Sequence, residues 1–204
     1  MSSSKIALVP FENSPFPYRG QIPEKNKPFI DVIEDGRLGH TSPRGGVYWE
    51  DLTYSDRRVL LSIPRGFDAR RPAVIVVYLH GNLAKLGRDV RDRQGVPRQV
   101  AESGLNAVLV VPQFAVDALD SSAGRFWQPG AFTQYLGEAA ERLAQLYGDD
   151  RVRGTFERAP VVIAAYSGGY HPAAFILQSG AVDGRLHGVI LLDGPFGDIE
   201  KFAD

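Results

Sequence analysis

Four uninterrupted apolar runs mark the chain from residue 73 onward. They cover residues 73–79, 106–111, 159–165 and 188–192. A run without a polar face is typical of a strand that is covered on both sides, as the strands of a parallel sheet are. The intervals between the runs are long enough for helices. This alternation predicts an α/β fold with a doubly wound, mostly parallel sheet flanked by helices.

Two of the intervals carry specific helix signals. Between Ala131 and Tyr147 the apolar residues fall at helical spacing, and Gly148 follows as a candidate C-cap. A shorter helix is predicted from about Pro97 to Gly104, because proline suits the first turn of a helix and glycine suits the position beyond its end.

The first part of the chain follows a different pattern. Prolines recur there before any sustained periodicity, so we predict an irregular N-terminal arm over residues 1–46. Residues 47–54 and 58–63 are rich in β-branched, aromatic and aliphatic residues, and Ser55-Asp56 between them suits a turn. We therefore predict an N-terminal hairpin and place the α/β domain at residues 47–204.

Composition and charge narrow the classes of function. A chain of 204 residues, 44% of them apolar, is long enough for one domain with a sizeable core. A net charge of −1 gives no general attraction to nucleic acid or anionic membranes. Because the sequence has no cysteine, no glycine-rich phosphate motif and no histidine-rich metal spacing, we expect no cofactor and no metal. No apolar stretch suits a signal peptide or a membrane span, so we expect a cytoplasmic protein.

Candidate chemistry lies just after the third apolar run. The strand leads into a helix through Ala165-Tyr166-Ser167-Gly168-Gly169. Pro172 must sit in the first turn of that helix, which leaves Ser167 on the turn itself. The turn lies at the edge of the sheet where α/β proteins bind ligands, and small residues stand two positions before and after the serine. A serine that only forms the turn or caps the helix is the alternative.

This segment resembles the nucleophile elbow of the α/β-hydrolase superfamily, with alanine in place of the first glycine of Gly-x-Ser-x-Gly. The resemblance covers residues 47–204. It implies a serine hydrolase in which Ser167 attacks an ester, thioester or amide carbonyl of a small-molecule or peptide-like acyl substrate. A binding or scaffold module that keeps the fold without catalysis is the alternative.

The superfamily also lends two backbone amides to an oxyanion hole. Carried over by position, these would be the amides of Asn82, in the loop Tyr78-Leu-His-Gly-Asn-Leu83, and of Gly168. Because the family uses the backbone at this loop, we expect the imidazole of His80 to support the loop without touching substrate.

The resemblance further implies an acid and then a histidine after the serine. Asp193 follows the last apolar run at the correct edge of the sheet and is the candidate acid, with a turn-forming or capping role as the alternative. No histidine follows His187, which we expect on the surface. Nothing in the sequence places His40 at the serine, and His171 is expected to line the pocket or cap its helix.

The missing base fits a chain that stops before the superfamily fold is complete. The sequence accounts for about six strands, and residues 189–192 would form an apolar edge strand, which complete proteins avoid. We therefore expect a truncation after the sixth strand, with the catalytic histidine beyond Asp204 and this chain alone inactive.

Two further segments are placed near the binding edge. Residues 112–130 form a long connection that contains Phe126 and Trp127, which would either wall a substrate site or extend the core. Residues 83–93 mix basic and acidic side chains and are interpreted as a solvated helix face. The sequence leaves the identity of the substrate and the oligomeric state open.

Overall fold

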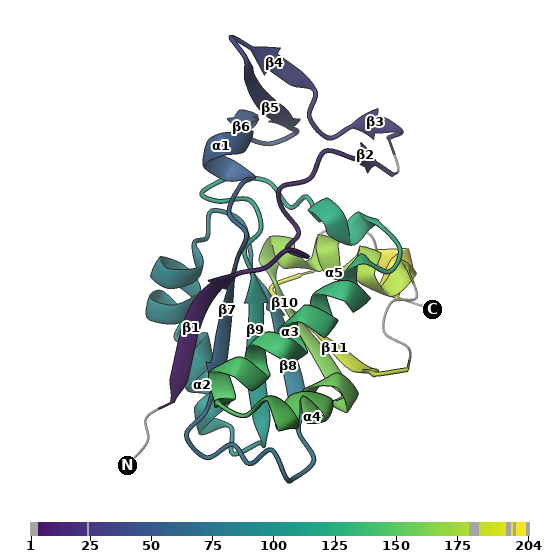
Figure 1. Ribbon diagram of the computed structural model, residues 1–204. Helices are drawn as coiled ribbons and strands as arrows, with labels where there is room; N and C mark the ends of the chain where they lie inside the picture. The colour runs from purple at the N-terminus through teal and green to yellow at the C-terminus, as the bar shows by residue number, and fades with distance from the viewer. Residues whose placement is uncertain (1–3, 24, 180–183, 195–196, 198, 203–204) are drawn as a thin grey trace.

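A six-stranded sheet forms the centre of the computed structural model, which describes residues 4–23, 25–179, 184–194, 197 and 199–202 (Figure 1). The strand order is β1-β7-β9-β8-β10-β11, with bounds β1 (Lys5–Pro10), β7 (Arg58–Ile63), β8 (Val74–Leu79), β9 (Ala107–Pro112), β10 (Val161–Tyr166) and β11 (Leu186–Leu192). Strands β9, β8, β10 and β11 are parallel, whereas β7 is antiparallel to β1 and β9. The predicted mostly parallel α/β sheet is confirmed.

The four predicted apolar runs correspond to the four parallel strands. Every residue of β9 is buried, as expected for a strand with neighbours on both sides and helices on both faces. The edge strand β11 departs from this pattern, because Ile190 and Leu192 are 50% and 44% exposed. One face of the sheet is therefore uncovered near β11.

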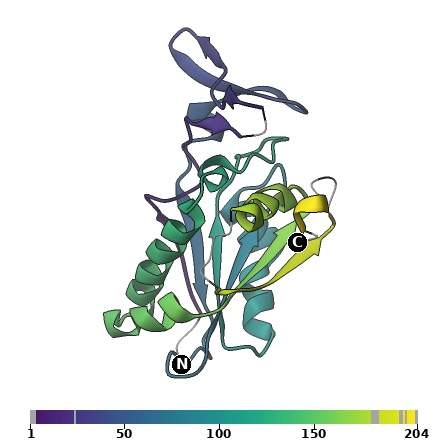
Figure 2. The same ribbon diagram turned by 90° about the vertical axis from the view of Figure 1, so that its right-hand side faces the viewer.

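Helices lie on both faces of the sheet (Figures 1 and 2). One face carries α3 (Ala131–Tyr147), α4 (Arg153–Arg158) and α5 (Tyr170–Gln178), and the other carries the π-helix η1 (Leu86–Arg93) and α2 (Val96–Glu102). The 3-10 turns are η2 (Gly124–Trp127), η3 (Asp150–Val152), η4 (Ser167–Gly169) and η5 (Ile199–Phe202). Both predicted helices are confirmed, and Gly148 ends α3 with φ 92°. Within the described residues, no helix is long and apolar enough to cross a membrane.

The prediction of an irregular arm over residues 1–46 is wrong at residues 5–10. Residues 5–10 form β1, which pairs along its whole length with β7 at the edge of the main sheet. Proline is tolerated at Pro10 because it ends an edge strand, where its missing N–H is not needed. The physical reason for the error is that the residues of β1 pair with residues 48 to 58 positions further along the chain, which no local pattern reveals.

The predicted pairing of residues 47–54 with residues 58–63 is also wrong. The remaining N-terminal elements are β2 (Gln21–Ile22), β3 (Lys27–Pro28), β4 (Val32–Glu34), β5 (Arg37–Ser42), β6 (Gly46–Trp49) and α1 (Glu50–Thr53). An N-terminal hairpin exists, but β6 forms it with β5, and β7 enters the main sheet instead. Residues 59–63 are all buried, so they need the two-sided cover of that sheet.

The small sheet of β4, β5 and β6, here called the N-terminal sheet, lies beyond the carboxyl ends of the parallel strands (Figures 1 and 2). It is fastened to the loop after β9. The hydroxyl of Ser42 donates to the carbonyl of Leu119 at 2.8 Å, and the amide of Leu119 donates to the hydroxyl of Tyr48 at 3.1 Å. Arg44 donates to Ser121 Oγ at 2.9 Å. The N-terminal sheet thus holds the loop in place above the sheet edge.

Replacing Tyr54 by phenylalanine is expected to lower the free energy of unfolding by about 1–3 kcal/mol. The fully buried Tyr54 hydroxyl donates to Asp120 Oδ2 at 2.5 Å, and burial together with Asp120 raises the pKa of Tyr54. Phenylalanine leaves that buried carboxylate oxygen without this donor. Urea unfolding measures the loss, with Tyr147→Phe as the control because the Tyr147 hydroxyl bonds no described residue. Equal stability of the two variants would contradict the contact.

Candidate active site

Ser167 occupies a sharp corner between β10 and α5. The strand ends at Tyr166, and the 3-10 turn η4 follows at once. Pro172 is the third residue of α5, so it lies in the first turn as expected. Ser167 has φ 49°, in the left-handed region that costs a non-glycine residue about 1–2 kcal/mol. Such strain is concentrated at functional sites, and it places the serine side chain at the carboxyl edge of the sheet.

Two glycines allow the corner to lie close to β8. A Cβ atom on Gly169 would overlap the carbonyl oxygen of Leu79 and lie 2.8 Å from its carbon. A Cβ atom on Gly81 would lie 3.0 Å from the Cβ of Ser167. The requirement for a small residue at position 169 follows from the sequence, whereas that at Gly81 becomes visible only in the folded chain.

The two amides of the expected oxyanion hole belong to neighbouring segments. A Cβ atom on Gly168 would lie only 2.9 Å from the side-chain amide of Asn82, so the loop after β8 touches the corner after β10. Within the described chain, neither the Asn82 amide nor the Gly168 amide donates to another group. Gly168 also stands at the N-terminal side of α5, where partial positive charge accumulates.

The side chain of Asn82 fixes its loop. With the amide oriented to satisfy its neighbours, its nitrogen donates to the carbonyl of Asp120 at 2.9 Å and to Ser121 Oγ at 3.1 Å. Its oxygen accepts from Arg44 at 2.8 Å. The loop after β8, the loop after β9 and the N-terminal sheet therefore meet at this one residue.

The side chain of His80 supports the same loop from inside the protein. It is buried, its Nδ1 bonds the carbonyl of Gly81 at 2.7 Å, and its Nε2 accepts from the amide of Phe114 at 2.9 Å. Burial lowers the pKa of His80 to about 4, which makes it neutral at pH 7. Both ring nitrogens are used, so the expectation of a structural role is confirmed.

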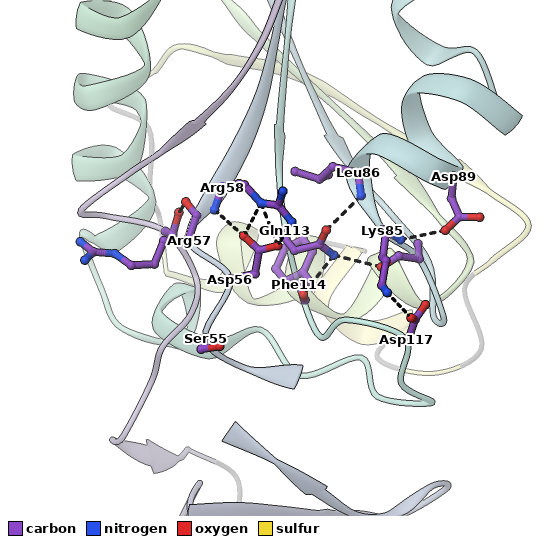
Figure 3. Close-up of polar contacts among 12 residues, drawn as sticks. Ser55, Asp56, Arg57, Arg58, Lys85, Leu86, Asp89, Gln113, Phe114 and Asp117 are labelled. Carbon is purple, nitrogen blue, oxygen red and sulfur yellow. Dashed lines mark hydrogen bonds and ion pairs between the residues drawn. The ribbon is translucent and has the colours of Figure 1, made fainter. Parts of the chain in front are cut away.

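Gln113 links this loop to η1 (Figure 3). Its Oε1 accepts from the amide of Leu86 at 3.0 Å, and its Nε2 donates to the carbonyl of Ala84 at 3.0 Å. Gln113 is buried, so these bonds are shielded from water. The only signal for Gln113 in the sequence is its position directly after an apolar strand, which resembles the position of the candidate site residues.

The cavity in front of Ser167 has a volume of about 560 Å³. Its lining residues are Asn82, Leu83, Arg88, Asp89, Arg93, Tyr166 and Ser167. No histidine is among them. Arg88, Asp89 and Arg93 come from the segment interpreted as a solvated helix face, so this interpretation misses their place at the cavity.

The other described histidines have their own surroundings. His40 Nδ1 lies 2.6 Å from the carbonyl oxygen of Phe29, and His40 Nε2 lies 3.6 Å from Asp120 Oδ2. His171, in the first turn of α5, packs against Phe175 with ring centroids 4.9 Å apart. Both line a second cavity of about 160 Å³ rather than the one at Ser167. His187 is exposed on β11, as expected.

The two aromatic residues of the long connection lie in different surroundings. Phe126 is 1% exposed and packs among Phe114, Phe132 and Tyr135. A substrate contact of Phe126 is therefore corrected to a role in the core. Trp127 lines the second cavity with His171, and its buried Nε1 has no hydrogen-bond partner among the described residues.

Asp193 leaves the sheet next to Ser167. Leu192 of β11 is paired with Tyr166 of β10, so the residues that follow them emerge at the same edge. Asp193 has φ 55° and is exposed, and it makes no hydrogen bond or ion pair with another described residue. A Cβ atom on Gly194 would lie 3.7 Å from the carbonyl oxygen of Ser167. The candidate acid is thus at the correct edge without a partner that orients it.

A groove of about 530 Å³ lies on the uncovered face near β11. Apolar side chains of β8, β10 and α2 dominate its lining, which includes Val76, Val96, Ala164, Tyr166 and Leu192. In the part of the chain that the structure describes, no group of three histidine, aspartate or glutamate side chains could hold a metal ion.

No protein-family model and no curated protein matches the sequence. Among solved structures, the chain is similar to an S-formylglutathione hydrolase from Agrobacterium tumefaciens, with 16% identity over 78% of this chain and 59% of that chain and a TM-score of 0.44. It is similar to LpqC, a poly(3-hydroxybutyrate) depolymerase from Bordetella parapertussis, with 18% identity over 76% and 51% of the two chains and a TM-score of 0.35. A feruloyl esterase module from Clostridium thermocellum gives 12% identity, 86% and 56% coverage and a TM-score of 0.35. The chain spans less than two thirds of the length of each.

Proposed function

We propose that this chain carries the nucleophile and the oxyanion hole of a serine hydrolase that acts on a carboxylic ester, thioester or amide. The observation that carries the proposal is the left-handed conformation of Ser167 at the corner between β10 and α5, beside the loop of Asn82. A serine at such a corner presents its hydroxyl to an incoming carbonyl. The resemblance of residues 165–169 to the nucleophile elbow supports the same role.

In the proposed reaction, Ser167 Oγ forms a bond to the carbonyl carbon of the substrate, and the carbonyl oxygen becomes an oxyanion. The amides of Asn82 and Gly168 would bind this oxyanion, a contribution for which each donor is worth about 3–4 kcal/mol of barrier. The bond from the carbonyl carbon to the leaving group then breaks, the base that took the serine proton gives it to the departing alcohol, thiol or amine, and the acyl group stays on Ser167. Water attacks the acyl group, releases the carboxylic acid and restores the serine.

The proton of Ser167 needs an acceptor. No histidine among the described residues lines the cavity at Ser167, so we propose that a histidine beyond Asp204 acts as the base. The exposed carboxylate of Asp193, at the same edge of the sheet, would orient that histidine. The same lack of a base favours a second candidate function, a module that binds an acyl compound at Ser167 without cleaving it.

Covalent labelling separates the two functions. The full natural polypeptide that contains this sequence is expected to react with a fluorophosphonate probe at Ser167, as located by mass spectrometry of the labelled peptide. Ser167→Ala should abolish the reaction, whereas Ser103→Ala, which alters a serine remote from the corner, should retain it. A folded protein that stays unlabelled would overturn the hydrolase proposal and support the binding module.

A further inference from the structure

Two arginines and one aspartate stand in the wall of the cavity that contains Ser167. Arg88, Asp89 and Arg93 all belong to the π-helix η1. π-Helices are rare in proteins, and those that occur are often found at functional sites. The wall carries one more positive than negative charge.

The aspartate is the buried anchor of this group. Its side chain is 5% exposed, and it accepts from the amide of Lys85 at 2.8 Å and from Arg88 Nε at 2.9 Å (Figure 3 shows the bond to Lys85). Burial alone would raise the pKa of Asp89, but the hydrogen bonds from Arg88 and Lys85 outweigh it and lower the pKa. Asp89 is therefore ionised at pH 7, and its carboxylate oxygens accept hydrogen bonds from groups of the protein itself.

Arg88 is occupied in the same way. Its Nη2 donates to the carbonyl of Leu83 at 2.8 Å and to Asp117 Oδ1 at 2.7 Å. Lys85 neutralises the other oxygen of Asp117 at 2.7 Å, as Figure 3 shows. Arg88 thus stabilises the loop after β8 and leaves little of its guanidinium for a ligand.

Arg93 differs from Arg88 because its terminal guanidinium nitrogens are not used by other described residues. Its Nε lies 3.1 Å from Asp89 Oδ1, and this ion pair holds the Arg93 side chain beside the buried carboxylate. Its two terminal nitrogens bond no described residue, and the side chain is 70% exposed. The terminal N–H groups of a guanidinium form a planar fork that matches a carboxylate.

We infer that Arg93 binds a carboxylate of the substrate beside Ser167, so that the protein acts on esters that carry a free carboxylate elsewhere in the molecule. The inference rests on the proposed function for the identity of the reacting group. The cavity of about 560 Å³ is large enough for such a small molecule. Neutral esters of the same shape lack the group that the arginine binds.

Binding to the Ser167→Ala variant of the full natural polypeptide tests the inference without any reaction. The probes are benzyl hydrogen glutarate, which is anionic, and benzyl methyl glutarate, which is neutral, in NMR chemical-shift titrations. We expect the dissociation constant of the anionic ester to be about tenfold lower at low salt, and the preference to shrink as salt is added. The added variant Arg93→Gln should remove the preference.

Arg91→Gln is the matched control. Arg91 lies on the same π-helix, pairs with Asp92 at 2.7 Å and does not line the cavity, so its loss should leave the preference intact. Equal affinity for the two esters, no binding of either, or the same result for both arginine variants would overturn the inference. Because the titration needs no nucleophile, failure of fluorophosphonate labelling alongside an Arg93-dependent preference would refute the hydrolase and retain the carboxylate site.

Discussion

The Gly169→Ala variant is expected to lose more than about 3 kcal/mol of its free energy of unfolding. The added Cβ would overlap the carbonyl oxygen of Leu79, and that oxygen belongs to the backbone of β8. Strand β8 is paired with β9 on one side and β10 on the other, so it cannot move aside without breaking both ladders. Urea unfolding followed by circular dichroism measures the loss.

Gly137→Ala provides the matched control for this change. Gly137 lies inside α3, and a Cβ there would meet no atom within 4 Å. Alanine should therefore stabilise the protein by about 0.5–1 kcal/mol through its higher helix propensity. An unfolding midpoint of Gly169→Ala at or above that of the unchanged protein would show that the corner does not approach β8 as closely as described.

The corner at Ser167 could be predicted from the sequence. Local sterics alone predict it: an apolar strand ends at Tyr166, Pro172 limits where the helix begins, and small residues surround Ser167. The parallel strands could be predicted for a similar reason, since burial on both faces leaves a continuous apolar run in the sequence.

Long-range partners could not be predicted in this way. Residues 5–10 and 46–49 both contain good strand formers, but only the folded chain shows that β1 pairs with β7 and β6 with β5. Strand propensity reflects how well a residue fits a pleated, half-buried surface, and it does not identify the strand with which the residue pairs. The predicted hairpin between residues 47–54 and 58–63 was wrong because it paired each segment with its nearest neighbour in the sequence.

Two site residues show the same limit. Phe126 in a long loop suits a substrate wall and a core equally well, and its packing among Phe114, Phe132 and Tyr135 decides for the core. Arg93 alternates with acidic residues, which is typical of a solvated helix face. Its place at the cavity depends on how η1 docks beside the loop after β8, and that is a property of the tertiary structure.

Acidification is expected to destabilise the protein through His80. The folded-state pKa of His80 is about 4 because the ring is buried, whereas an unfolded histidine titrates near about 6.5. The unfolded chain therefore takes up the proton first as the pH falls. The contribution of His80 to stability is complete above about pH 6.5 and is lost between about pH 6.5 and pH 4, by about 3 kcal/mol in total.

A comparison with His80→Gln isolates this contribution from the titration of carboxylates. The variant loses the hydrogen bonds to Gly81 and Phe114, so it should be less stable than the unchanged protein at pH 7.5. It has no imidazole to protonate, so the stability difference should narrow by about 3 kcal/mol as the pH approaches 4. Urea unfolding at several pH values measures the difference, and NMR of the imidazole nitrogens reports its protonation. A difference that stays constant would mean that His80 is not held neutral, and the loop that carries Asn82 would then depend on other contacts.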